Sequence, residues 1–273
     1  MSDIPQVKLN NGVVMPQLGF GVLKMSDGDD VRKAVTCALR EGYRSIDTAK
    51  AYGNETGVGQ AIKDSGIPRE EIFLTTKLWN RDQGYESTLQ AFQQSLERLD
   101  SEYVDLYLIH WPGKDNYKNT WRAMEKLHGD GLIRAVGVSN FQIHHLDDLL
   151  GSSTVVPVVN QIELHPYLTQ EELRSYCTSH DIRVEAWSPL GQGALLQDQT
   201  LQGLAKKHQR SAAQIILRWD IQNGIIVIPK SANPARIREN MSLFDFSIDA
   251  EDMKSIDNLN RNQRTGPDPD VFF

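Results

Sequence analysis

The feature of this sequence that most constrains its fold is a repeated alternation of short apolar runs with amphipathic segments. The runs are nearly continuously apolar, which is typical of parallel strands covered on both faces. They recur every ~25–33 residues, the spacing of strand–helix units. We therefore predict eight strands, at residues 17–22, 43–47, 72–79, 104–111, 133–140, 157–166, 183–190 and 224–231.

These units predict an α/β fold, a single (β/α)8 TIM barrel over residues 1–273. A doubly wound sheet would favour a Gly-x-Gly-x-x-Gly loop after its first strand, and the chain has no such motif. Asn11–Gly12 lies between two short extended runs and predicts a β-hairpin at 5–16, which we expect to close the bottom of the barrel. Beyond the last strand we expect extra C-terminal helices and a tail, 258–273, near the mouth of the active site.

Composition excludes several classes of partner. The net charge of −7 gives no general attraction for nucleic acid or anionic lipid. No run approaches the roughly 18 apolar residues of a membrane helix, and the N-terminus lacks a signal-peptide pattern, so we expect a soluble, cytoplasmic protein. We also expect a monomer, since nothing indicates a large apolar interface. Cys37 and Cys177, without a CxxC motif, are expected to be buried free thiols.

Polar residues follow the predicted strands on one side of the fold. The carboxyl ends of barrel strands form one rim, where barrel enzymes place their chemistry. Asp47 ends the second strand, Lys77 lies near the end of the third and His110 near the end of the fourth, while Tyr52 follows Asp47 in a loop. We therefore expect these four side chains to converge.

The four residues suit the reduction of a carbonyl group. A tyrosine with the usual pKa of about 10 is a poor proton donor at neutral pH, and we predict that Lys77 lowers the pKa of Tyr52. Asp47 would be the counter-ion of Lys77. His110 would orient the carbonyl oxygen. Each residue taken alone is as compatible with a structural role, and only their convergence favours a reaction site.

The motifs resemble those of the aldo-keto reductase superfamily, in family order along the chain. GYRSIDTAKAYGNETGVG (42–59) is similar to the first family signature. TTKLW (75–79), LYLIHWP (106–112), RAVGVSNF (134–141), VNQIELHP (159–166), AWSPLGQG (186–193) and IPKSANPARIREN (228–240) follow it. The ordering of the motifs is similar to that of the prokaryotic branch of 2,5-diketo-gluconate reductases and glyoxal/methylglyoxal reductases, and the short loops, notably WPGKDNYKN (111–119), also fit that branch. The resemblance implies an NADPH-dependent carbonyl reductase, with Tyr52 as general acid and Asp47, Lys77 and His110 as the other catalytic residues.

The cofactor site is predicted partly from charge and partly from the resemblance. Lys230, Ser231, Arg236 and Asn240 would gather two cations and several donors, which suits a 2′-phosphate and favours NADPH over NADH. The remaining contacts are implied by the resemblance alone: Gly21; Ser139, Asn140 and Gln161 for the nicotinamide carboxamide; Trp187 stacked on its ring; Ser188 and Leu190 for the pyrophosphate; and Glu239 for the adenine side.

The expected substrates are aldehydes and small ketones, α-oxoaldehydes such as methylglyoxal foremost. Leu23, Lys24, Trp79 and Trp111 are predicted to line the substrate pocket. Leu23 stands where many relatives have an aromatic residue, so the pocket would be wider here. Lys50 either draws anionic substrates to the mouth or points into solvent.

Two other functions remain open from the sequence. A relative on this scaffold can serve as an NADPH-binding sensor subunit with little turnover. A metal-dependent hydrolase would need a cluster of His, Asp and Glu at the rim, for which His110 and the pair Glu163–His165 are available. We expect His144 and His145 to point apart on a helix surface, and we predict no metal site.

Two local predictions concern helix starts. Glu55 is expected in the first turn of a helix, where the helix dipole favours an acid. Thr169 and Glu172 have the spacing of a capping box at the start of another helix.

Overall fold

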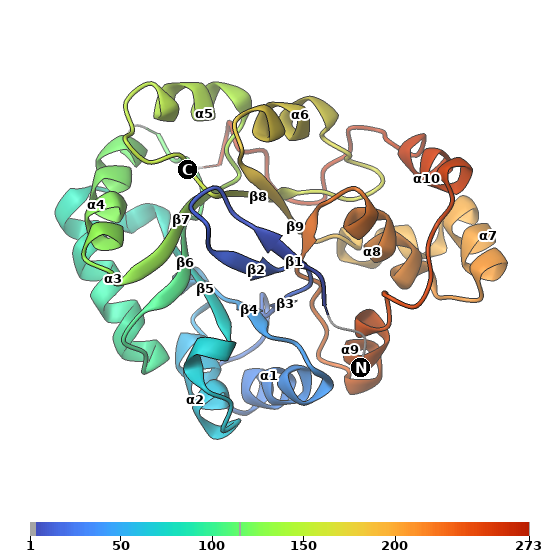
Figure 1. The fold of residues 1–273 in the computed structure, drawn as a ribbon, viewed down its shortest axis with the longest axis horizontal. Helices are drawn as coiled ribbons and strands as arrows, with labels where there is room; N and C mark the ends of the chain where they lie inside the picture. The colour runs from blue at the N-terminus through green and yellow to red at the C-terminus, as the bar shows by residue number, and fades with distance from the viewer. Residues whose placement is uncertain (1–3, 115, 273) are drawn as a thin grey trace.

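The computed structural model describes residues 4–114 and 116–272, which form the predicted α/β barrel (Figure 1). Eight parallel strands follow one another around the sheet in chain order, each hydrogen-bonded to the next. They are β3 (Phe20–Gly21), β4 (Ser45–Asp47), β5 (Phe73–Leu78), β6 (Val104–Ile109), β7 (Ile133–Ser139), β8 (Val159–Glu163), β9 (Arg183–Trp187) and β10 (Ile226–Val227).

The sheet closes where the first strand meets the last. Leu18 forms a parallel bridge with Val227. Gly19 N donates to the carbonyl oxygen of Val227 at 2.8 Å, and Gly21 N donates to that of Pro229 at 3.2 Å. These few backbone bonds form a short seam between two-residue strands.

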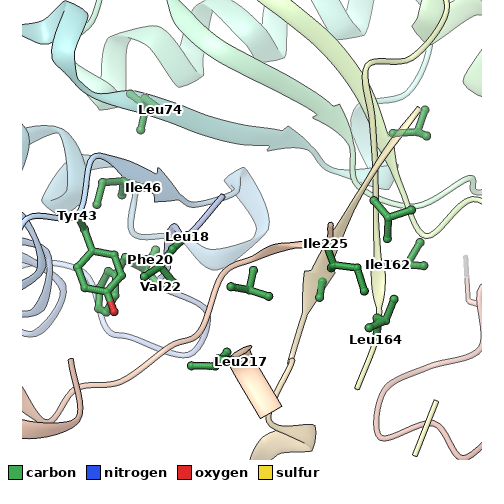
Figure 2. Close-up of a cluster of buried hydrophobic side chains, with 14 of the residues drawn as sticks. Leu18, Phe20, Val22, Tyr43, Ile46, Leu74, Ile162, Leu164, Leu217 and Ile225 are labelled. Atoms are coloured by element: carbon green, nitrogen blue, oxygen red, sulfur yellow. The ribbon is translucent and has the colours of Figure 1, made fainter. Parts of the chain in front are cut away.

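Helices surround the strands (Figure 1). Most of them bury a stripe of apolar residues at the spacing of an amphipathic helix, whereas α9 and α10 each bury one apolar and one polar residue. Figure 2 shows part of this core, where Phe20 and Ile46 from neighbouring strands lie near Tyr43. The helices are α1 (Asp29–Glu41), α2 (Glu55–Asp64), α3 (Tyr85–Leu99), α4 (Tyr117–Gly129), α5 (Ile143–Leu150), α6 (Glu171–Ser179), α7 (Gln199–His208), α8 (Ala212–Gln222), α9 (Pro234–Met241) and α10 (Ala250–Asp257).

The predicted N-terminal hairpin is present. Strand β1 (Gln6–Lys8) pairs antiparallel with β2 (Val14–Pro16), and the hairpin crosses the ring of strands in Figure 1. Leu9 and Met15 are buried against apolar side chains of β5, β6, β7 and β10. Because these contacts seal the barrel interior, the opposite end of the strands is left for the chemistry.

Several local predictions need correction. The capping box at Thr169 is wrong, because α6 starts after Gln170, which has φ 50° and makes no capping bond. A capping box instead begins α8, where Ser211 and Gln214 bond reciprocally. Of the two free cysteines, Cys177 is buried but Cys37 is only partly so.

Within residues 4–114 and 116–272, no helix is both long and apolar enough to span a membrane.

Candidate active site

A cavity of about 1050 Å³ opens at the carboxyl ends of the strands. Every site residue predicted from the sequence lines it except Lys77. Lys77 is fully buried behind the wall, where its ammonium group contacts Asp47. The fold therefore brings the predicted residues together. The role of each one depends on its hydrogen bonds and its charge, which are described next.

Asp47, Lys77 and Tyr52 form a connected polar group in the cavity wall. The Nζ of Lys77 lies 2.6 Å from Asp47 Oδ1, 2.9 Å from the carbonyl oxygen of Thr48 and 3.4 Å from Tyr52 Oη. The His110 ring stands edge-on to the Tyr52 ring, with their centroids 5.6 Å apart. A phenol and an imidazole thus meet at one point of the cavity, with a cation buried directly behind the phenol.

The loop that carries Tyr52 is held in place by hydrogen bonds of the Asn54 side chain, two residues further along the chain. Tyr52 ends a short 3₁₀ helix, η1 (Lys50–Tyr52), that follows β4. Asn54 donates from its side chain to the carbonyl oxygens of Val22 and Met25, and accepts from the hydroxyl of Thr48. These bonds tie the loop to the neighbouring β3–α1 connection, so the phenol is fixed relative to Lys77.

The electrostatics of this group correct one prediction. We expected Lys77 to hold the pKa of Tyr52 below its usual value. Burial instead raises the pKa of Tyr52 overall, and the opposing effect of Lys77 only reduces that rise. Burial also acts to lower the pKa of Lys77, but Asp47 and Tyr52 outweigh it and the pKa ends above its usual value. Tyr52 therefore stays protonated and Lys77 stays charged at neutral pH.

His110 is in its neutral form at neutral pH. Burial, and secondarily the charge of Lys77, hold the pKa of His110 well below its usual value. A neutral imidazole has one N–H donor and one acceptor nitrogen. It can therefore donate a hydrogen bond to an uncharged oxygen placed beside Tyr52.

A second polar group lies at the ends of β7, β8 and β9. Asn140 donates to the carbonyl oxygen of His110 at 2.9 Å and to Ser139 Oγ at 3.1 Å, while its own Oδ1 accepts from the indole of Trp187 at 2.8 Å. Gln161 Nε2 donates to Asp47 Oδ2 and to Glu185 Oε2. Within the described residues Gln161 Oε1 and Glu185 Oε1 have no hydrogen-bond partner, and of the two residues Gln161 lines the cavity.

The far end of the cavity is formed by the loop after β10 and by α9. Asn233 caps α9 by accepting from the backbone N–H groups of Ala235 and Arg236. Lys230 and Arg236 are exposed, and neither has a carboxylate partner within 4–114 and 116–272. Two unpaired cations beside a helix start suit a phosphate group.

The C-terminal segment forms one side of the cavity. Glu163 accepts from Thr265 N and Thr265 Oγ1, each at 2.5 Å, and from Gly266 N at 3.2 Å. A Cβ at Gly266 would lie 2.4 Å from Cη2 of Trp187, so only glycine fits there. Further along, the Phe272 ring packs on Trp111 with a centroid distance of 4.5 Å.

Known proteins are similar to this chain over nearly its whole length. The profile described as the Aldo/keto reductase family matches residues 17–261. Glyoxal reductase of Bacillus subtilis (strain 168) is 59% identical over 267 residues, which cover 98% of this chain and 97% of the relative. Methylglyoxal reductase DkgA of Escherichia coli (strain K12) is 46% identical over 276 residues, which cover 100% and 99%. A mutant of Gox0644 solved in complex with NADPH has a TM-score of 0.95 and 44% identity, and covers 100% of both chains.

The chain belongs to the aldo/keto reductase family. The prokaryotic branch, expected from the ordering of the motifs and from the short loops, agrees with the two bacterial relatives.

Several charged residues of this family member have partners that the sequence did not predict. Lys50 neither points into solvent nor lines the cavity, because its Nζ lies 2.7 Å from Asp82 Oδ2. Glu55 does begin α2, but it is buried and bonded to Thr76 at 2.6 Å and Arg98 at 2.7 Å. Both residues therefore support the walls of the barrel.

His144 and His145 do not point apart as expected. Their ring centroids are 4.0 Å apart, and the Nε2 atoms lie 3.3 and 3.8 Å from Asp270 Oδ1. His145 Nδ1 accepts from the backbone N–H of Gln142, so the neutral ring carries its proton on Nε2, the atom that a metal would need. This group is the closest approach to a metal site in the part of the chain that the structure describes.

Three cavity or network residues escaped prediction from the sequence. Phe272 lies in a tail without a periodic pattern. Gln192 accepts from Lys24 Nζ at 3.1 Å and donates to the carbonyl oxygen of Thr265 at 3.3 Å, and so joins two sides of the cavity. Glu185 has a signal in the sequence, since it is an acid flanked by the apolar residues Val184 and Ala186 of a predicted strand.

Proposed function

We propose that this protein reduces aldehydes and small ketones to alcohols with NADPH, α-oxoaldehydes such as methylglyoxal being favoured. The observation that carries the proposal is the 3.4 Å contact between Tyr52 Oη and Lys77 Nζ at the wall of the cavity, with neutral His110 beside it. Membership of the family and the two glyoxal-type relatives support the same reaction.

The cavity fits NADPH at both of its ends. Lys230 and Arg236 are unpaired among the described residues, and with Ser231 and Asn240 they would hold the 2′-phosphate. Gln161 Oε1 is a free acceptor at the other end, and would accept from the carboxamide N–H of the nicotinamide. Trp187 lines the cavity between these ends and would stack on the ring.

The residues of the chain supply the proton and the orientation. When bound, NADPH provides the hydride that the carbonyl carbon receives. His110 donates a hydrogen bond to the carbonyl oxygen and holds it beside Tyr52. The phenol of Tyr52 gives its proton to that oxygen, and the resulting phenolate is stabilised by the ammonium group of Lys77. Asp47 keeps Lys77 charged and in place.

Aromatic walls favour small, compact substrates. Trp79 and Trp111 line the cavity next to His110, and Phe272 covers both indoles. Lys50 pairs with Asp82 and does not line the cavity, and Lys24, which does line it, already donates to Gln192, so an anionic substrate gains no unoccupied cationic partner beside these walls in the described chain. A short dicarbonyl needs none.

A panel of substrates tests the proposal directly. NADPH consumption is measured with methylglyoxal, aromatic aldehydes, ketoses and diketo-acids under matched conditions. We expect methylglyoxal to give the highest kcat/KM. Tight NADPH binding without reduction of any aldehyde would instead favour the cofactor-sensing subunit.

Replacing Tyr52 with phenylalanine isolates the proton donor. Tyr52→Phe removes one oxygen and leaves the ring in place, so we expect turnover to fall about 10²-fold or more while NADPH affinity is nearly unchanged. Affinity is measured by titration of NADPH fluorescence, and turnover at saturating aldehyde. A variant that retains turnover would remove Tyr52 from the catalytic role.

A further inference from the structure

The barrel interior holds a second carboxyl group close to the catalytic residues. Glu185 lies on β9 and is fully buried. Its Oε2 accepts from Gln161 Nε2 at 2.8 Å, and the same nitrogen donates to Asp47 Oδ2 at 2.9 Å. Glu185 is therefore two hydrogen bonds from Asp47, through Gln161, and three from Lys77.

The charges around Glu185 do not balance if it is ionised. Lys77 is one cation, and Asp47 already bonds to it at 2.6 Å. Glu185 has no cationic partner within the described chain, and its Oε1 has no hydrogen-bond partner there. An unpaired carboxylate is very costly to bury, so the group avoids that cost by keeping its proton.

The groups that face Glu185 have opposing effects on its pKa, and those that favour the protonated form outweigh the others. The titratable ones are Asp47 from β4, Lys77 from β5 and Tyr52 from η1. Burial, followed by the charge of Asp47, raises the pKa of Glu185 to about 8, although Gln161 and Lys77 oppose the rise. Glu185 thus carries its proton at neutral pH and loses it as the pH rises through about 8.

Glu185 also helps to orient the side chain of Gln161. The two amide hydrogens of Gln161 are both used by carboxyl oxygens, so its Oε1 is turned away from them. If the amide were reversed, its oxygen would face Asp47 and an acceptor oxygen of Glu185. The orientation of Gln161 is therefore set by the two acids together.

We propose that Glu185 is a positioning residue that works in its protonated form: it shares the Gln161 amide nitrogen with Asp47, directs Gln161 Oε1 toward the cofactor, and leaves the charge of Lys77 to Asp47 and Tyr52. The inference rests on the proposed reductase function. Once ionised, Glu185 adds a negative charge that raises the pKa of Tyr52 and makes the phenol a weaker proton donor.

The first test is the pH profile of kcat/KM for methylglyoxal reduction. With only the protonated form of Glu185 competent, the wild-type value falls about tenfold between pH 7 and pH 9. Glu185→Gln is neutral at every pH and keeps an oxygen for Gln161, so its profile stays flat within about twofold over this range. A flat wild-type profile, or an unchanged fall in E185Q, would overturn the proposal.

Asp220 provides a matched control. It lies on α8, is fully buried, and burial raises its pKa well above the usual value, yet it does not line the cavity. Asp220→Asn should leave the alkaline fall in kcat/KM unchanged. Loss of the fall in D220N as well would mean that it reflects the protein as a whole rather than Glu185.

The second test needs neither cofactor nor substrate. Infrared spectra of the unliganded D220N protein are recorded as a function of pH, and the C=O band of a protonated carboxylic acid should disappear as the pH rises through about 8. The band should be missing throughout in the E185Q/D220N double variant. A band that persists in the double variant would assign the proton to another group. A protein without aldehyde reduction would refute the proposed function, while this titration would still decide the state of Glu185.

Discussion

Two arginines on the same helix differ in whether their charge is paired within the protein or available to a ligand. Arg236 and Arg238 are both exposed on α9. Arg238 bonds Glu41 of α1 through Nε at 3.0 Å and Nη2 at 2.7 Å. Arg236 lines the cavity and has no such partner in the described residues. The unpaired arginine is therefore the one available to a ligand.

This difference makes a paired prediction. Arg236→Ala should weaken NADPH binding by about 1.5–3 kcal/mol, because a charge-assisted bond to the 2′-phosphate is lost. NADH has no such phosphate, so its affinity should change much less. Arg238→Ala is the control and should alter neither affinity. Dissociation constants for both cofactors, measured by fluorescence titration, decide the matter, and equal losses for NADPH and NADH would contradict the assignment.

For single residues, the sequence predicted where the catalytic side chains lie better than it predicted how their surroundings shift their pKa values. Asp47, Lys77 and His110 could be placed because they end barrel strands, and strand ends share a rim. The direction of the Tyr52 pKa shift was wrong, because it depends on how tightly the pocket encloses the ring. Glu185 was passed over for a related reason: its role depends on a partner, Gln161, on another strand.

Among the elements, the C-terminal segment is the one whose path is set by distant residues. Glu163 holds it through Thr265 and Gly266. Beyond that anchor, Phe272 reaches the two indoles of the substrate pocket. No periodic pattern in the tail predicts this, because the contacts cross from one end of the sequence to its middle.

Truncating Phe272 should affect substrate and not cofactor. In Phe272→Ala the cover over Trp79 and Trp111 is lost, and we expect KM for methylglyoxal to rise about fivefold, the equivalent of ~1 kcal/mol of aromatic contact. NADPH affinity should be unchanged. Val271→Ala, at a neighbouring side chain that is 70% exposed, is the matched control. A parallel rise in both variants would point to general loosening of the tail.

Helix starts show why local motifs are weaker guides than periodicity. Thr169 with Glu172 and Ser211 with Gln214 both have the spacing of a capping box, and only the second pair forms one. Gln170 takes a left-handed conformation that shifts the start of α6 by a residue. A capping motif shows that the side chains needed for a capping box are present. The backbone conformation of the residues just before the helix decides whether the box forms.

Across the whole molecule, stability and chemistry occupy opposite ends of the barrel. The hairpin seals one end with Leu9 and Met15, and the cavity opens at the other. The spacing of apolar runs was enough to predict this architecture. It could not give the exact strand lengths: β3 and β10 have two residues each, although longer runs surround them.

The separation can be tested in the hairpin. Met15→Ala should lower the free energy of unfolding by about 2–5 kcal/mol, because it leaves a cavity in the sealed end. Val14→Ala, at an adjacent residue that is 47% exposed, should change it by no more than about 0.5 kcal/mol. Urea denaturation followed by tryptophan fluorescence gives both values. The folded Met15→Ala protein should keep wild-type kcat/KM, and a large drop would show that the two ends are coupled.

The short seam between β3 and β10 has a consequence for association between chains. A sheet that has not yet closed exposes two edges, and an exposed edge is a template onto which a strand of another molecule can pair. Here each edge strand is only two residues long. If the barrel opens at this seam, during folding or by local unfolding, each edge therefore exposes few unpaired backbone groups to another molecule. This limits edge-to-edge aggregation.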